Sequence, residues 1–271
     1  MHTYFFILPA LLYSLCAGLP ASQRSAISLA TVIAWLLHGT ALWLEVSTPG
    51  SLRVGFAMML SIALWISVAA YWLESRNFAL DGLRMLILPC AAVTVILPLA
   101  FPGSSFPLEK STPLFAWHIV IAIMAYGTFT IAAFHAVLMT LQESRLHARP
   151  DIKAANAGWL DAAIDRLPAL LTMEKLLFRL IAIGFVFLTL TVLSGVVFSE
   201  QLFGKPLKWD HKTVFTLFSW VLFGVLLAGR YWRGWRGKTA LNFTLAGFAT
   251  LLLGYVGSHF VLEVVLHRGL A

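Results

Sequence analysis

Six histidines fall in or beside the long apolar segments of this 271-residue chain, and they are the side chains best suited to chemistry. They are His38, His118, His135, His211, His259 and His267. A neutral imidazole has one nitrogen that donates a hydrogen bond and one that accepts a hydrogen bond or binds a metal. Two histidines facing each other across helices can therefore hold a haem iron axially. For any single histidine, a structural hydrogen bond between helices is the more frequent role.

A second candidate is the segment 201–211, which contains Phe203-Gly204-Lys205-Pro206-Leu207-Lys208-Trp209-Asp210-His211. Aromatic side chains could cover a flat amphipathic ligand while the lysines pair with its carboxylates. The alternative is a band of aromatic residues with basic flanks at a membrane interface. Asp210 could equally serve as an N-cap for the following helix. The spacing alone favours the interfacial band and the cap over a ligand site.

The composition indicates that the elements positioning these residues are membrane helices. Hydrophobic residues make up 60% of the chain, charged residues only 11%, and the mean hydropathy is +0.85. Soluble domains carry roughly a quarter charged residues, so this chain could not cover its own surface in water. The net charge of +7 comes from short basic clusters between apolar segments, and no nucleic-acid partner is expected.

About eight apolar segments are long enough to cross a bilayer, which needs about 20 residues each. They are 2–21, 27–47, 54–74, 82–101, 114–140, 176–200, 211–232 and 239–266. Uniformly apolar segments of this length predict helices and not a barrel. The predicted fold is therefore all-α: a polytopic membrane helix bundle in which residues 1–271 form a single transmembrane domain.

The basic residues predict the orientation of the bundle. Thirteen of the 19 Lys and Arg residues fall on one side of the eight segments. The positive-inside rule places that side in the cytoplasm, so both termini and the loop 201–211 are expected outside. The connection 141–175 is expected to be cytoplasmic. Its Asp161–Leu171 stretch has an apolar face, which predicts an amphipathic segment on the inner bilayer surface with Trp159 as an anchor.

This topology distributes the histidines unevenly. His118 is expected about 6 Å below the outer end of the fifth span. His211, His259 and His267 are expected near the same outer surface, His38 near the middle of the bilayer, and His135 at the cytoplasmic end. The acidic residues lie at span ends and in loops, and no Walker loop, nucleophile elbow or CxxC motif is present. A proton-coupled pump, a solute or metal-ion transporter and a hydrolase are therefore disfavoured, and the protein is not expected to be a complete enzyme.

Several stretches resemble the cytochrome c assembly superfamily of haem-handling membrane proteins (the CcsA and CcmC type), and most closely its short YpjD/HemX-like branch. The stretches that carry the resemblance are 173–181, 189–195, Trp209-Asp210-His211-Lys212-Thr213, Gly234-Trp235-Arg236-Gly237 and 254–258. Together they are specific, and they are densest from Leu167 onward. The resemblance implies a bacterial inner (cytoplasmic) membrane location.

The resemblance also implies site residues. The family has an outer loop of the form WGxxWxWD, flanked by outer histidines that ligate haem. Here Trp209 and Asp210 match that loop, whereas Phe203 replaces its first tryptophan. His118 matches the first outer histidine, and His267, or else His259, is similar in position to the second. His38 resembles a histidine embedded in the membrane, and Arg230 stands where its histidine partner is expected.

These matches predict a protein that binds haem b and delivers it at the outer face, with His118 and His267 as iron ligands. Haem transport of this kind would serve apocytochrome c or other cytochrome c assembly proteins. The alternative is a regulatory or scaffold protein of tetrapyrrole biosynthesis, similar to HemX and without tightly bound haem. Its cytoplasmic connection would then bind a soluble tetrapyrrole enzyme.

Overall fold

The computed structural model describes residues 3–46, 51–78, 80–107, 113–147, 164, 167–203, 209–257 and 260. Within these ranges eight α-helices account for most of the chain, as predicted. Their bounds are α1 (Tyr4–Gly18), α2 (Arg24–Val46), α3 (Phe56–Ser75), α4 (Asp81–Ala100), α5 (Pro113–His147), α8 (Leu170–Phe203), α9 (His211–Arg233) and α10 (Gly237–Leu252). Two short helical turns, η1 (Ala21–Gln23) and η3 (Leu253–Gly257), precede α2 and follow α10.

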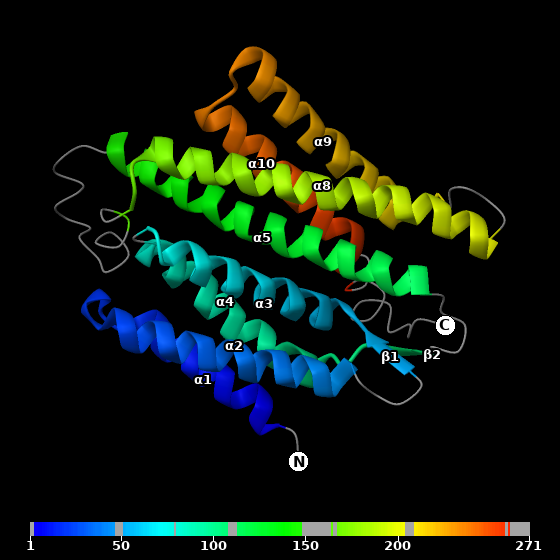
Figure 1. The fold of residues 1–271 in the computed structure, drawn as a ribbon, viewed down its shortest axis with the longest axis horizontal. Helices are drawn as coiled ribbons and strands as arrows, with labels where there is room; N and C mark the ends of the chain where they lie inside the picture. Colours follow the sequence, from blue (N-terminus) through cyan, green and yellow to red (C-terminus); the bar gives the residue numbers. More distant parts are fainter. Residues whose placement is uncertain are drawn as a thin grey trace.

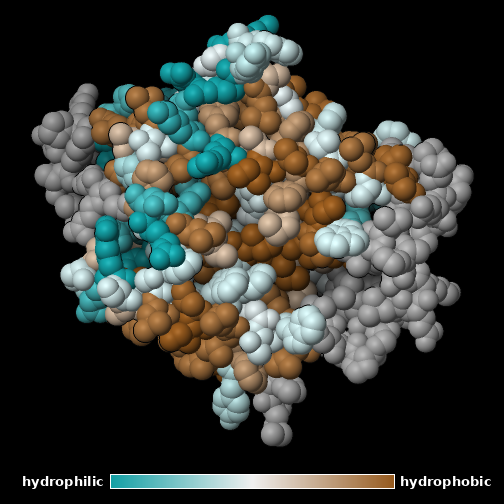
Figure 2. Space-filling view, in the orientation of Figure 1, coloured by the Kyte–Doolittle hydropathy of each residue, from teal (hydrophilic) through white to brown (hydrophobic). Residues whose placement is uncertain are grey.

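Among the described residues, six of these helices are long and apolar enough to cross a bilayer. The shorter members of the bundle are α1, with 15 residues, and α10, with 16. Large apolar side chains such as Leu36, Val93 and Val186 point outward and are exposed on the helix surfaces. Figure 2 shows hydrophobic residues across the middle of the visible face. A surface of this kind is stable against lipid and not against water.

Helices that follow one another in the chain run antiparallel, and their termini gather at two ends (Figure 1). At one end, here called the basic end, α2, α4, α8 and α10 begin and α3, α5 and α9 end. At the opposite end, here called the ribbon end, α3, α5 and α9 begin and α2 and α8 end. Hydrophilic residues in Figure 2 gather toward the basic end and the turn between α9 and α10. The positive-inside prediction makes the basic end cytoplasmic.

A short β-ribbon gives the ribbon end its name, and it was not predicted from the sequence. Strand β1 (Ser51–Val54) pairs antiparallel with β2 (Ser104–Pro107), with Ser51 opposite Pro107 and Val54 opposite Ser104. The ribbon joins the α2–α3 connection to the α4–α5 connection. Four-residue strands are too short to show a period of two convincingly, so the sequence indicated only turns here.

Helices α5 and α8 are longer than predicted, with 35 and 34 residues instead of the expected spans 114–140 and 176–200. At 1.5 Å per residue each is about 50 Å long, well beyond the roughly 30 Å of the hydrocarbon core. The segment 141–175 therefore begins and ends as helix. Trp159 and the residues 161–163, 165 and 166 of the predicted amphipathic stretch lie outside the described residues. Of its described members, Ile164 and Leu167 are buried in the core of the bundle, whereas Leu171 is exposed.

Close helix contacts stabilise the bundle. Phe129 of α5 stacks on Phe223 of α9 with ring centroids 3.9 Å apart. A Cβ on Gly127 would lie 2.6 Å from Ile66 Cγ2, so the glycine permits α3 and α5 to approach closely. Between α2 and α3, Trp35 and Trp65 stack at 4.7 Å, and each indole N–H donates to the other residue's carbonyl oxygen. These contacts hold fixed the helices that carry the candidate site.

Candidate functional site

His118 lies on α5 near the ribbon end, and a hydrogen bond to α8 sets its orientation. Its Nδ1 is 2.8 Å from Ser194 Oγ. The single hydroxyl proton of Ser194 is donated to the carbonyl oxygen of Thr191 at 3.1 Å, so Ser194 accepts from His118. This arrangement puts the ring proton of His118 on Nδ1 and the lone pair on Nε2. A metal-ligating histidine has the same arrangement, with its second nitrogen held by a hydrogen bond.

Gly195 makes room for the His118 ring on α8. A Cβ at this position would lie 3.4 Å from His118 Cε1, at the limit of ordinary contact. The side chain of His118 is half-buried, and its neighbour Trp117 is exposed. The imidazole therefore contacts α8 on one side and lies near the surface of the bundle.

Asp210 and Trp209 lie at the start of α9, also at the ribbon end. Asp210 is the N-cap: its carboxylate accepts hydrogen bonds from the backbone N–H of Thr213 at 2.8 Å and from the Thr213 hydroxyl at 2.9 Å. The N-cap alternative raised by the sequence is therefore correct as a structural role. Trp209, just before the cap, is 74% exposed. Phe203 is the last residue of α8, and the loop between 203 and 209 lies outside the described residues.

The two candidate partners of His118, His259 and His267, also lie outside the described residues. Beyond Gly257, the last residue of η3, the structure describes only Phe260, whose ring centroid lies 5.4 Å from that of Phe56 at the start of α3. Helix α10 runs from the basic end back toward the ribbon end (Figure 1). The axial pair predicted from the sequence therefore stays a prediction.

His38 is fully buried between three helices. Its Nε2 is 2.9 Å from Ser61 Oγ on α3, and its Nδ1 is 3.4 Å from the Tyr13 hydroxyl on α1. The Tyr13 ring also meets the imidazole edge-on, with centroids 5.9 Å apart. Both nitrogens are engaged in this arrangement, so an iron at His38 would have to displace Ser61 or Tyr13. The contacts fit a histidine that joins helices.

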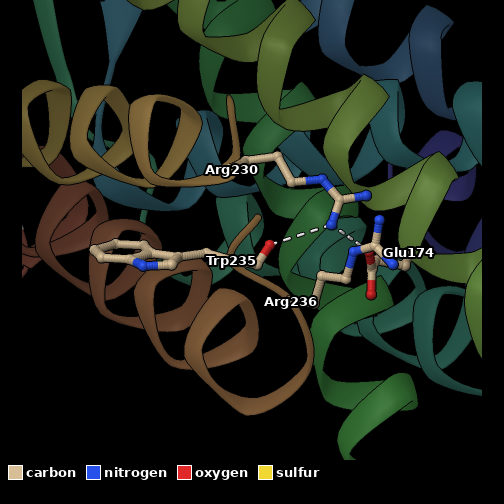
Figure 3. A network of polar contacts seen from close by, with 4 residues as sticks. All are labelled: Glu174, Arg230, Trp235 and Arg236. Atoms are coloured by element: carbon tan, nitrogen blue, oxygen red, sulfur yellow. Dashed lines mark hydrogen bonds and ion pairs between the residues drawn. The ribbon is translucent and has the colours of Figure 1, made fainter. Parts of the chain in front are cut away.

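Ion pairs hold the basic end, and Figure 3 shows their principal network. Arg230 of α9 pairs with Glu174 of α8 through Nη1 and Oε1, which are 2.7 Å apart. Arg230 also donates to the carbonyl oxygen of Trp235 at 3.2 Å, and its guanidinium lies 4.6 Å from the centre of the Phe178 ring. Arg236 approaches Glu174 at 3.7 Å. Arg230 stands where the family resemblance leads one to expect a histidine. In this chain the position is therefore part of an ion-pair network.

A second charged contact at the basic end joins α3 and α5. The Nδ1 of His135 donates to the carbonyl oxygen of Ile131 at 3.0 Å. Its Nε2 lies 3.2 Å from Glu74 Oε2, close enough for an ion pair but not aligned as a hydrogen bond. The contact brings a buried imidazole of α5 next to a carboxylate at the end of α3.

The described residues contain no group of three or more His, Cys, Asp or Glu side chains placed to hold a metal ion. A metal centre made entirely of such residues within the described ranges is therefore not present. A haem needs fewer protein ligands, because the porphyrin supplies four nitrogens and the protein only one or two axial groups.

Comparison with known proteins decides the family. The profile of the Cytochrome C assembly protein family matches residues 26–266, which is most of the chain. The chain belongs to this family. The family prediction made from the sequence is confirmed, and the matched region includes both the His118 site and the ion pairs of the basic end.

Relatives within the family point to the same branch. The chain is similar to the inner membrane protein YpjD of Escherichia coli K12, with 29% identity over 90% of this chain and 88% of the relative. It is also similar to the cytochrome c biogenesis protein CcsA of Prochlorococcus marinus AS9601, with 24% identity over 95% of this chain and 89% of that protein. CcsA of Chlamydomonas reinhardtii is 27% identical over 73% of this chain. No solved structure matches.

The inner-membrane location predicted for this family member agrees with the name of its YpjD relative and with the six spans. Sequence reasoning named His118, Trp209 and Asp210 but missed Ser194 and the Glu174–Arg230 pair. One signal was available: Glu174 near the start of one span and Arg230 near the end of the next must meet at the same end of antiparallel helices. Nothing in the local sequence identifies Ser194 as the partner of His118.

Proposed function

We propose that this family member binds haem b near the ribbon end and presents it on the outer face to a partner in cytochrome c assembly. The observation that carries the proposal is the orientation of His118. Ser194 holds the Nδ1 proton, so Nε2 carries the lone pair that an iron requires.

The remaining residues fit a supporting role. Trp209 is largely exposed beside the Asp210 cap and offers a flat aromatic surface to a porphyrin face. Phe203 would add to that surface, and His267, or else His259, would supply the second axial nitrogen. When bound, haem would supply the redox-active iron and the vinyl groups that a recipient takes up. The protein itself would orient, hold and release it, and would not act as a complete enzyme.

Two residues on the same helix test the ligand assignment. The full chain is purified from haem-replete cells, and haem is measured by its absorption band and by pyridine haemochrome. We expect His118→Ala to lose most of the haem, because an axial nitrogen is removed. His147→Ala is the matched control, since His147 is exposed at the opposite end of α5. Equal haem content in both variants would refute the ligand assignment.

The second outer ligand and the alternative function are tested in the same preparation. His267→Ala and His259→Ala should differ, with only the axial ligand losing haem. A parent protein that neither carries haem nor binds added haem would exclude haem delivery. That result would instead favour the regulatory role in tetrapyrrole biosynthesis, in which the cytoplasmic connection binds a soluble enzyme.

A further inference from the structure

A polar pocket opens at the basic end between α2, α3 and α4, far from His118. Its volume is about 130 Å³, and since one water needs on the order of 15 Å³ of such space, a group of several atoms fits. Its lining is rich in arginine, hydroxyl and aromatic side chains: Arg24, Ile27, Ser28, Thr31, Tyr71, Trp72, Ser75, Arg76, Phe78, Leu80, Asp81 and Arg84. Three arginines against one carboxylate leave the pocket with a net positive charge.

The deepest cation of the pocket is incompletely partnered. Arg84 is only 1% exposed, and its Nη2 donates to the carbonyl oxygen of Leu19 at 2.8 Å. The carboxylate of Asp81 lies 3.9 Å from Nη2, a weak contact. Within the described ranges, Arg84 Nε has no hydrogen-bond partner. A buried charged donor without an acceptor is costly, so an anion in the pocket would stabilise the site.

The mouth of the pocket is preorganised by Trp72. Its indole N–H donates to Ser28 Oγ at 2.9 Å and so links α3 to α2. The guanidinium of Arg76 lies 5.0 Å from the centre of the Trp72 ring, which positions this exposed arginine at the opening. Arg24, the first residue of α2, also lines the pocket. Planar guanidinium groups bind phosphate oxygens with paired hydrogen bonds.

The surroundings of the pocket indicate a lipid. Leu29 and Ile33 of α2 and Leu73 of α3 are exposed apolar residues on the same helix segments that line it. An acyl chain can lie along such residues while its headgroup reaches the arginines. Basic pockets between membrane helices on the cytoplasmic side are suited to anionic headgroups.

We propose that this pocket binds the phosphate of an anionic glycerophospholipid, with Arg84 inside and Arg24 and Arg76 at the mouth. The lipid then ties the ends of α2, α3 and α4 together. This site rests on no part of the haem proposal, because the pocket lies at the basic end whereas His118 lies near the ribbon end.

Lipid retention by the full chain tests the site. The purified protein is washed in detergent and offered phosphatidylglycerol or phosphatidylcholine, and bound lipid is measured by native mass spectrometry. We expect selective retention of phosphatidylglycerol. Arg24→Gln combined with Arg76→Gln should weaken that retention roughly 30-fold, since each basic residue near a headgroup contributes about a factor of five.

The matched control is Arg233→Gln combined with Lys238→Gln, which removes two exposed charges from the α9–α10 turn at the same end. This control should retain phosphatidylglycerol like the parent. Equal losses in the two double variants, or equal retention of the two lipids by the parent, would overturn the proposal. Thermal stabilisation by inorganic phosphate, equal to that by phosphatidylglycerol at matched ionic strength, would assign the pocket to a free anion and overturn the lipid.

Discussion

The two ends of the helix bundle differ in the partners that their polar side chains contact. At the basic end, carboxylates face basic side chains across helices: Glu174 pairs with Arg230, and Glu74 lies 3.2 Å from His135. At the ribbon end, the described contact between helices is neutral, from His118 to Ser194, and the carboxylate of Asp210 caps its own helix. One end is held by charge pairs, whereas the other holds a neutral imidazole in a defined tautomer.

This difference bears on where a metal cofactor fits. A neutral histidine with a fixed Nδ1 proton can ligate iron, whereas an arginine cannot. Arg230 occupies the position at which a buried histidine partner for His38 would be expected, and it is committed to Glu174. His38 itself is engaged with Ser61 and Tyr13. The chemistry proposed here therefore concentrates on the ribbon end, while the basic end fixes the helices relative to one another.

The largest effect is expected from Glu174→Gln, which removes the carboxylate shared by two arginines. The side chain of Glu174 is 9% exposed and that of Arg230 is 26% exposed. Leaving a largely buried arginine unpaired should cost about 3 kcal/mol, the low end for such losses because Arg230 retains some solvent. Thermal unfolding in detergent measures the change.

Lys175→Gln is the matched control for this substitution, since Lys175 is the exposed neighbour of Glu174. It should leave the stability within about 0.5 kcal/mol of the parent. The double variant Glu174→Gln with Arg230→Gln should be less destabilised than the sum of the two single variants. Strict additivity would show that the 2.7 Å contact does not couple the two residues.

A smaller loss is expected from Glu74→Ala at the same end. Without this carboxylate, His135 Nε2 is buried with no polar group of α3 beside it. The cost should be about 2 kcal/mol, the range for an unsatisfied buried polar group. Glu143→Ala, on the basic-end turns of α5, is the control. If both variants have the same melting temperature as the parent, the Glu74–His135 contact does not contribute to stability.

The sequence predicted the helices better than it predicted their contacts. Hydropathy located all eight helices because a span of about 20 apolar residues is a strong signal. It missed the terminal turns of α5 and α8. Glu143 and Arg145, for example, look like loop residues, although they continue α5 beyond the bilayer. The β1–β2 pairing was missed because it joins connections that are about 50 residues apart in the chain, which no local pattern records.

The candidate site was predictable only in part, for a similar reason. Asp210 was recognisable as a cap because capping acts within three residues. The Ser194 contact of His118 spans 76 residues, and a serine in an apolar helix usually bonds its own backbone. The family resemblance proposed His118 as a ligand, but only the packing of α5 on α8 showed that its Nδ1 is the nitrogen bonded to Ser194.

At the ribbon end, Ser194→Ala should reveal whether that tautomer matters. Losing the acceptor of a half-buried N–H should lower the stability by about 1.5 kcal/mol. If haem is bound as proposed, its affinity should also fall roughly 10- to 100-fold, as for other partners of metal-ligating histidines. Thr189→Ala is the control, because its hydroxyl bonds the backbone of α8 and accepts from the Trp220 indole of α9 but lies more than one turn from Ser194. Unchanged haem affinity in Ser194→Ala would show that the hydrogen bond does not orient an iron ligand.

The smallest effect is expected from the helix cap. Asp210→Ala removes the acceptor for both the backbone N–H and the hydroxyl of Thr213, and it also removes a negative charge from the N-terminus of α9. The loss should be about 1 kcal/mol. Asp210→Asn is the matched variant, because it keeps the acceptor and removes only the charge, so it should recover more than half of that loss. Hydrogen exchange locates the effect: the Thr213 amide should exchange faster in Asp210→Ala, whereas amides near the middle of α9 should not. If the two variants are equally destabilised, the charge and not the hydrogen bond stabilises this turn.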